Sequence, residues 1–141
     1  MTASGSRHLV DPELIGLLDS FPSIHLTPET LPTVRALSFE TPVDPAAIEA
    51  VEMTTRTVPG PKGAPDVGVV IYRPKGASGA APCIFHVHGG GYVLGAAAAG
   101  EATQRPLAAA LGCAIVSVEY RLAPETAYPG AVKTPTPRWA G

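Results

Sequence analysis

Two nearly continuous apolar runs, Cys83–Val87 and Cys113–Val118, place the strongest constraint on how this chain folds. Runs of this kind are typical of strands that are buried on both faces of a sheet. The glycines Gly89–Gly91 follow the first run, and the stretch from there to Leu111 fits a helix with Gly112 as its C-terminal cap. Strand, crossover helix and strand in this order predict a right-handed unit with parallel strands, and therefore an α/β fold class.

A hairpin is expected upstream of this unit. Side chains alternate in character over Val51–Val58, and a second strand-like run covers Val67–Arg73. The turn residues Pro59–Gly63 lie between them, so the two runs are predicted to pair. In the helix after the glycines, Pro106 fits best near the first turn, because proline has no N–H to donate.

Short helices are predicted in the N-terminal part of the chain. A capping residue followed by proline begins a helix well, and this pair occurs at Asp11, Thr27 and Asp44. Apolar residues follow the first pair at helical spacing: Leu14, Leu17, Leu18 and Phe21. Pro22 is expected to end this helix, and Pro32 weakens the second.

The composition excludes several classes of protein. Hydrophobic residues make up 45% of the chain and charged residues 16%, as in globular rather than disordered proteins. The net charge of −2 gives no basic surface for nucleic acid or an anionic membrane. The longest apolar stretch, Leu107–Val118, is too short to cross a bilayer, and no signal segment is recognisable at the N-terminus. With Cys83 and Cys113 expected as reduced thiols, these features predict a soluble cytoplasmic protein.

The glycines after His88 carry the most specific chemistry in the sequence. Consecutive glycines leave the backbone uncovered and allow positive φ, so that successive amide N–H groups can point at one place. Such donors form an oxyanion hole, which stabilises a developing negative oxygen, and losing one donor costs roughly 100- to 1000-fold in rate. Gly89, Gly90 and Gly91 are therefore the candidate oxyanion-hole residues.

Three other interpretations of this loop stay open on the residues alone. The glycines fit an ordinary tight turn between a strand and a helix. They fit a phosphate-binding loop poorly, because the dinucleotide pattern needs glycine where Leu94 stands, Gly95 comes one residue late, and the P-loop lysine is missing. His86 and His88 share a face of the strand, as two metal ligands would, but no third ligand is evident nearby, so no metal site is predicted.

Two longer motifs carry a family resemblance. Phe85–Gly95 resembles the His-Gly-Gly-Gly signature of the hormone-sensitive-lipase-type carboxylesterases, and Val116–Glu125 resembles the second hallmark of that family. The helix beginning at Asp11–Pro12 resembles the family's N-terminal cap segment. The resemblance implies an α/β-hydrolase fold with a mostly parallel sheet and N-terminal cap helices. It divides the chain into a tail with cap helices over residues 1–50, part of the hydrolase core over residues 51–132, and a divergent tail over residues 133–141.

The resemblance also implies what the site does. The family hydrolyses small-molecule carboxylic esters through a Ser-His-Asp triad without a cofactor, and its oxyanion hole draws N–H groups from the glycine loop. By motif, Gly90 and Gly91 are the donors and Gly89 gives them room. His88 supports the loop through hydrogen bonds, and Tyr92 lines the acyl pocket or the underside of the loop.

The catalytic triad itself is absent from the 141 residues. No Gly-x-Ser-x-Gly occurs, and Gly76–Ala80, which comes nearest, fits a flexible surface turn. No histidine follows His88, and Ser117 is expected to point into packing. Glu119 and Glu125 fit a solvated or hydrogen-bonded structural pair better than catalytic acids. Because removing a triad costs about a millionfold in turnover, the chain alone is predicted to be inactive.

The end of the sequence departs from the family pattern. Prolines at 135 and 137 forbid a helix over Lys133–Gly141, as expected of a truncated hydrolase that arose from a frameshift, a degraded gene or a gene-model error. In the resembled fold, the strand Cys83–Val87 would pair on one side with the strand that carries the nucleophile, so that edge is predicted to be open. Self-association through this edge, or pairing with a complementary C-terminal fragment, is then expected. The alternative function is a non-enzymatic remnant or binding module that uses the edge or the acyl pocket.

Overall fold

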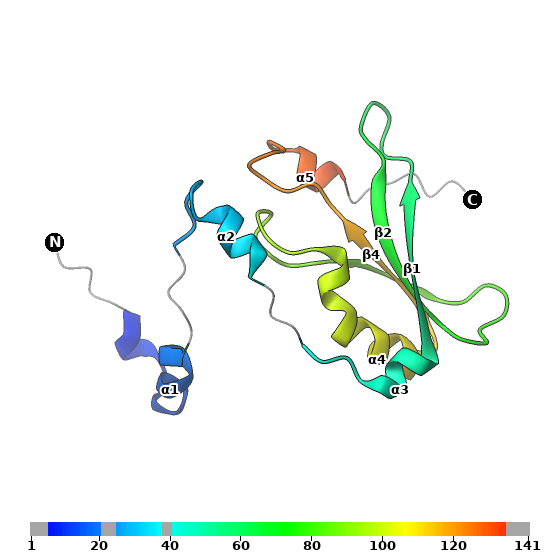
Figure 1. Cartoon of the computed structure of the whole chain (residues 1–141), viewed down its shortest axis with the longest axis horizontal. Helices are drawn as coiled ribbons and strands as arrows, with labels where there is room; N and C mark the ends of the chain where they lie inside the picture. The colour runs from blue at the N-terminus through cyan, green and yellow to red at the C-terminus, as the bar shows by residue number, and fades with distance from the viewer. Residues whose placement is uncertain (1–5, 21–24, 38–40, 135–141) are drawn as a thin grey trace. The chain divides into compact units, whose positions relative to one another are not determined.

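The computed structural model describes residues 6–20, 25–37 and 41–134, in two compact units that divide the chain between residues 38 and 39. The first unit contains a 3₁₀ helix, η1 (Ser6–Leu9), and the helices α1 (Pro12–Ser20) and α2 (Leu31–Ala36) (Figure 1). The start of α1 is confirmed, because the Asp11 carboxylate accepts the N–H of Glu13 at 2.9 Å.

The helix α2 begins later than predicted. Residues 28–30 form a turn, the Thr30 hydroxyl accepts the N–H of Thr27 at 2.9 Å, and the helix starts at Leu31. Pro32 therefore lies in the first turn of α2, where a missing N–H leaves no helical hydrogen bond unmade. The predicted end of α1 at Phe21 and Pro22 lies outside the described residues.

The second unit holds a sheet with the strand order β1-β2-β4-β3 among the described residues. Its elements in chain order are α3 (Pro45–Ala50), β1 (Val51–Val58), β2 (Val67–Pro74), β3 (Cys83–Val87), η2 (Ala97–Gly100), α4 (Glu101–Leu111), β4 (Ala114–Glu119) and α5 (Gly130–Lys133). The predicted hairpin and the strand–helix–strand unit are confirmed, and with them the α/β class. The sheet is mixed, however, because β1–β2 and β2–β4 pair antiparallel and β3–β4 pairs parallel.

The core lies on both faces of the two inner strands. Successive side chains of a strand point to opposite faces, so β2 and β4 contribute to both layers. One layer is formed by Val51, Val70, Tyr72, Ala97, Ala108, Cys113 and Ile115. The other is formed by Val67, Val69, Val116, Val118, Tyr120 and Ala131. The helix α4 covers the first layer and α5 contributes to the second (Figure 1).

The helix α4 is held against its neighbours by a charged side chain. The buried Arg105 guanidinium donates to Glu101 Oε1 at 2.6 Å and to the carbonyl of Val51 at the start of β1. Gly112 ends the helix with φ 61°, as predicted. The placement of Pro106 near the first turn is wrong, since it lies inside α4, where it removes one helical N–H donor.

Described structure lies on both sides of the hydrolase-core segment predicted over residues 51–132. The helix α3 packs against α4 and β1, so the second unit begins well before residue 51. Lys133 belongs to α5 and Thr134 is buried, so the ordered structure continues past residue 132. Residues 135–141, with the two prolines, lie outside the described part of the chain.

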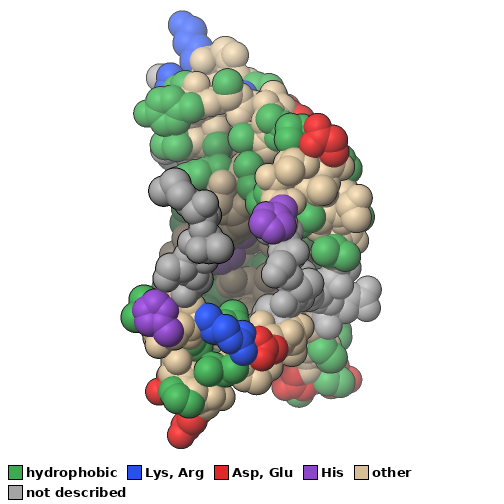
Figure 2. Space-filling model, turned by 90° about the vertical axis from the view of Figure 1, so that its left-hand side faces the viewer, with side chains coloured by type: hydrophobic (Ala, Val, Ile, Leu, Met, Phe, Trp, Pro, Cys, Tyr) green, Lys and Arg blue, Asp and Glu red, His purple; other side chains and the backbone are tan. Residues whose placement is uncertain are grey.

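The prediction that the run Cys83–Val87 is buried on both faces is wrong. Alternate residues of β3 are exposed, with Phe85 at 40% and Val87 at 47%, because β4 is its single neighbour among the described strands. One strand neighbour for β3 among the described strands agrees with the expected open edge. No described helix is long and apolar enough to cross a membrane. On the face that Figure 2 draws, charged side chains are scattered among hydrophobic ones and form no large patch of one sign.

Candidate functional site

The glycine loop leaves the sheet beside the end of β4. The parallel register pairs Val87 with Val118, so the chain emerges from both strands at the same edge of the sheet. His88 and the glycines after it therefore lie next to Glu119 and Tyr120. In α/β sheets this carboxyl end of the parallel strands is where ligands bind.

Glycine is required at specific points of this loop. Gly90 has φ 127°, and a Cβ there would lie 2.0 Å from the carbonyl oxygen of Leu94. That close approach belongs to a turn in which the N–H of Leu94 donates to the carbonyl of Gly90 at 2.9 Å. Gly91 has φ 60°, and the next residue, Tyr92, continues the left-handed conformation at φ 65°. The loop thus uses backbone conformations that residues with side chains rarely adopt.

The amides of the three candidate residues are available to a ligand. Among the described residues, no acceptor pairs with the N–H of Gly89, Gly90 or Gly91. All three glycines are exposed. These N–H groups are therefore not used in strand pairing. An oxyanion hole requires backbone N–H groups that are free in this way.

The buried ring of His88 supports the start of the loop through a hydrogen bond and a stacking contact. Its side chain is 9% exposed and stacks on Tyr120, with ring centroids 4.2 Å apart. Nδ1 donates to the carbonyl of Gly89 at 2.8 Å, and the Tyr120 hydroxyl donates to the carbonyl of His88 at 3.0 Å. Gly95 packs against the same ring, and a Cβ there would lie 2.5 Å from Nδ1. Gly95, to which the sequence assigned no role in the site, thus makes room for His88.

Tyr120 was missed as part of this site. Burial first, and then Tyr92 and Glu119, raise the pKa of its phenol above the ordinary 10.0. The hydroxyl therefore keeps its proton and remains a donor to His88. Tyr92 itself is 56% exposed, meets Tyr120 edge to face at 6.3 Å, and accepts the N–H of Ala123 at 2.8 Å. Tyr120 stands one residue after β4, and β4 runs parallel to β3, the strand before the loop. This position is the sequence signal that would have identified Tyr120.

Glu119 also reaches the loop. Its Oε2 accepts the N–H of Ala97 at 2.7 Å, and its Oε1 lies 3.9 Å from His88 Nε2. The side chain is 45% exposed. The sequence predicted Glu119 and Glu125 as a solvated or hydrogen-bonded structural pair; Glu119 is hydrogen-bonded, to Ala97.

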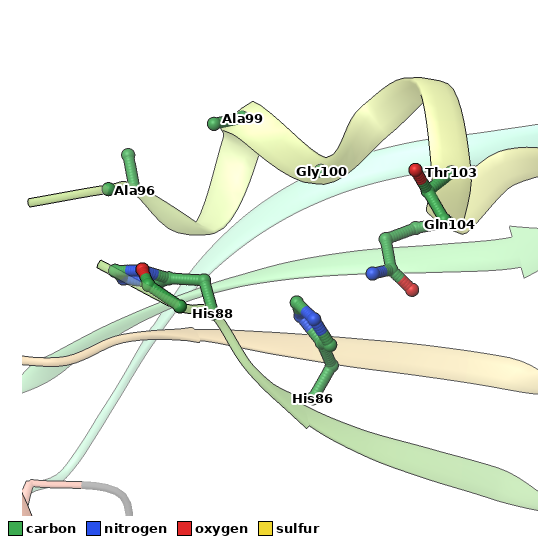
Figure 3. A pocket seen from close by; sticks show the side chains of 9 residues that line it. His86, His88, Ala96, Ala99, Gly100, Thr103 and Gln104 are labelled. Carbon is green, nitrogen blue, oxygen red and sulfur yellow. The ribbon is translucent and has the colours of Figure 1, made fainter. Parts of the chain in front are cut away.

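A cavity of about 330 Å³ opens beside the loop. Figure 3 shows the His86 ring pointing from β3 toward α4, where the side chain of Gln104 points back toward it. His86 Nδ1 lies 2.9 Å from the hydroxyl of Ser117, which is fully buried as predicted. Burial, and to a lesser extent His88, lower the pKa of His86 below 6.5. His86 is therefore a mainly neutral imidazole whose Nδ1 is occupied.

The described residues form neither a cluster of metal ligands nor an accessible serine nucleophile beside a base. Within them no three His, Cys, Asp or Glu side chains gather as metal ligands. Ser117 has the serine–histidine contact of a nucleophile but is 0% exposed, so a substrate does not reach it. The loop thus has backbone N–H groups without an acceptor and a buried histidine beneath it. Among the described serines, none is both accessible and in contact with a base.

The chain is similar to several known proteins. A family model described as the α/β hydrolase fold matches residues 84–135. The carboxylesterase NlhH of Mycobacterium tuberculosis is 32% identical over 138 residues, which are 96% of this chain and 43% of that protein. The acetyl esterase of Salmonella paratyphi B is 38% identical over 87 residues, which are 60% of this chain and 26% of that protein.

A solved structure gives the same result. A bacterial heroin esterase superposes with a TM-score of 0.72 at 31% identity, over 92% of this chain and 41% of that one. The chain thus spans less than half the length of the relatives that it matches.

Proposed function

Because this chain belongs to the α/β-hydrolase fold family, among the hormone-sensitive-lipase-like carboxylesterases, we propose that it forms the oxyanion-binding part of a carboxylic-ester hydrolase. The observation that carries the proposal is the set of unpaired amides of Gly89, Gly90 and Gly91 at the carboxyl end of β3. In the proposed reaction, a serine attacks the ester carbonyl and the oxygen becomes negative. Gly90 and Gly91 donate to that oxygen. The ester C–O bond then breaks, the alcohol leaves with a proton, and the acyl group stays on the serine; water attacks this acyl-enzyme, which releases the carboxylic acid and regenerates the serine hydroxyl.

The remaining residues of the loop keep these donors in place. The His88 ring donates to the carbonyl of Gly89, and the carbonyl of His88 accepts from the Tyr120 hydroxyl. The carbonyl of Tyr92 accepts the N–H of Ala123, which ties the other side of the loop to the chain after β4. Gly89 has open space around it, in keeping with a role in leaving room for substrate. The substrate class proposed is a small-molecule carboxylic ester. The cytoplasmic location stays a prediction.

The nucleophile, acid and base must come from outside these 141 residues. Gly89–Gly91 are also exposed, whereas oxyanion donors act most strongly where water is excluded. We therefore expect no appreciable ester hydrolysis from the 141-residue chain by itself.

A chimera tests the proposal. In it, residues 1–132 of this chain replace the matching segment of carboxylesterase NlhH, and turnover of a short p-nitrophenyl ester is compared with that of NlhH and of the chain alone. We expect turnover by the chimera and none by the chain. A chimera that melts cooperatively but does not hydrolyse the ester, while NlhH does, contradicts the proposal.

One edge of β3 faces no other described strand, and this edge favours a second candidate function, a binding module. The strand β3 contains no Lys, Arg, Asp or Glu, and its own side chains Phe85 and Val87 are exposed. An edge of this kind pairs readily with another strand. In this alternative the chain binds a complementary fragment or a second copy of itself, and the loop performs no catalysis.

A further inference from the structure

We propose that Glu119 is a positioning residue that ties the two ends of the oxyanion loop together. The proposal rests on the proposed function, since it explains how the amides of that loop stay oriented. Glu119 is the last residue of β4, and the loop begins beside it at His88 and ends beside it at Ala97.

One carboxylate oxygen holds the far end of the loop. Glu119 Oε2 accepts the N–H of Ala97 at 2.7 Å, which is short for a hydrogen bond from an amide and typical of a charged acceptor. Ala97 is fully buried in the core layer that α4 covers, so this bond fixes the point where the loop joins η2.

The other oxygen faces the near end. Glu119 Oε1 lies 3.9 Å from Nε2 of His88, and this nitrogen is buried without a hydrogen-bond partner among the described residues. Because Nδ1 donates to the carbonyl of Gly89, the ring is oriented with Nε2 toward Glu119. At 3.9 Å this contact is longer than a hydrogen bond, so Glu119 holds the near end by close packing against the edge of the His88 ring.

The two contacts together span the glycines. Between them, the N–H groups of Val93 and Leu94 both donate to the carbonyl of Gly90, so the middle of the loop is a turn that is closed on itself. The hydrogen bonds within the turn preserve its shape, but the whole turn can still rotate as a rigid body about the two points where it joins the rest of the chain. Fixing both ends to one side chain on β4 removes that rotation and sets where the amides of Gly90 and Gly91 point.

Amide exchange in the 141-residue chain tests this role without any ester present. The variants are Glu119→Ala and Glu119→Asp, which keeps the charge on a side chain one methylene shorter, with Glu52→Asp on the exposed face of β1 as the matched control. We expect both Glu119 variants to speed exchange of the Ala97 amide by about tenfold, the factor for one lost hydrogen bond. The amide resonances of Gly89–Gly91 should shift with it, and Glu52→Asp should change neither.

Two results overturn the proposal. One is faster exchange at Ala97 with unchanged glycine resonances, which would mean that Glu119 only caps η2. The other is a Glu119→Asp chain with the wild-type pattern, and this result decides the matter even where Glu119→Ala does not fold. Loss of ester hydrolysis by the chimera bears on the proposed function alone, because the exchange measurement contains no substrate.

Discussion

At the scale of single residues, the glycines of the loop do different things. Gly90 has no space for a Cβ, since the carbonyl of Leu94 would lie 2.0 Å away, whereas Gly91 has open space and only a positive φ. Gly95 is needed because the ring of His88 packs on it. The sequence identified Gly89–Gly91 by motif, but the reason for each glycine depends on atoms elsewhere in the loop.

The imidazole of His86 makes stability depend on pH. Its pKa in the folded chain is lowered below 6.5, first by burial and then by His88. Below pH 6.5 the unfolded chain therefore binds a proton that the folded chain does not, so this contribution to stability is complete above 6.5 and is lost as the pH falls. We expect the melting temperature to fall between about pH 7 and pH 5.5.

The variant His86→Gln isolates this effect. Glutamine keeps a hydrogen-bonding partner for Ser117 and does not titrate. We expect a smaller decrease in melting temperature over the same range than in the wild type. Equal decreases in the two proteins would assign the pH dependence to other groups.

At the scale of elements, the sequence predicted the features that depend on neighbouring residues and missed those that depend on tertiary contacts. The caps at Asp11 and Asp44 and the end of α4 at Gly112 were recognised, because each depends on atoms within a few residues. The position of Pro106 and the exposure of β3 were missed, because they depend on packing and on the number of neighbouring strands. Hydrophobic character alone does not distinguish a central strand from an edge strand.

The helix α3 offers a test of this local signal. The Asp44 carboxylate accepts the N–H of Ala46 at 2.9 Å and so caps the N-terminus of α3. This helix packs on α4 and β1. We expect Asp44→Ala to lower the free energy of unfolding by about 1 kcal/mol, as measured by urea denaturation. Asp44→Asn should retain most of the stability, and a loss as large as that of alanine would argue against the cap.

At the scale of the whole molecule, the two outer strands of the sheet differ. The β1 edge carries Glu52 and Arg56, charges that discourage pairing with another chain, whereas β3 carries none. The candidate site lies at the end of this same unprotected strand. The motifs predicted the loop and the open edge, but Tyr120 and Glu119 came from the register of the sheet, which no local pattern encodes.

We expect the 141-residue chain to associate with itself in a concentration-dependent way in sedimentation velocity. Val87→Lys should weaken this association, because it places a charge on the exposed side of β3. The matched control is Thr55→Lys on the exposed part of β1, which should leave it unchanged. A wild-type chain that stays monomeric over the whole concentration range, with a cooperative melt, contradicts this expectation.

The most direct test of the central claim is the turnover number of the chimera after Gly90→Ala, compared with Gly60→Ala. A Cβ at either position would lie 2.0 Å from a backbone carbonyl oxygen, that of Leu94 for Gly90 and that of Pro65 for Gly60, so alanine forces the local backbone to move in both. If the amides of the loop bind the oxyanion, Gly90→Ala displaces a donor and lowers turnover by about 100-fold or more, while Gly60→Ala in the turn between β1 and β2 does not. Equal turnover in the two variants would contradict the assignment of the oxyanion hole to Gly89–Gly91.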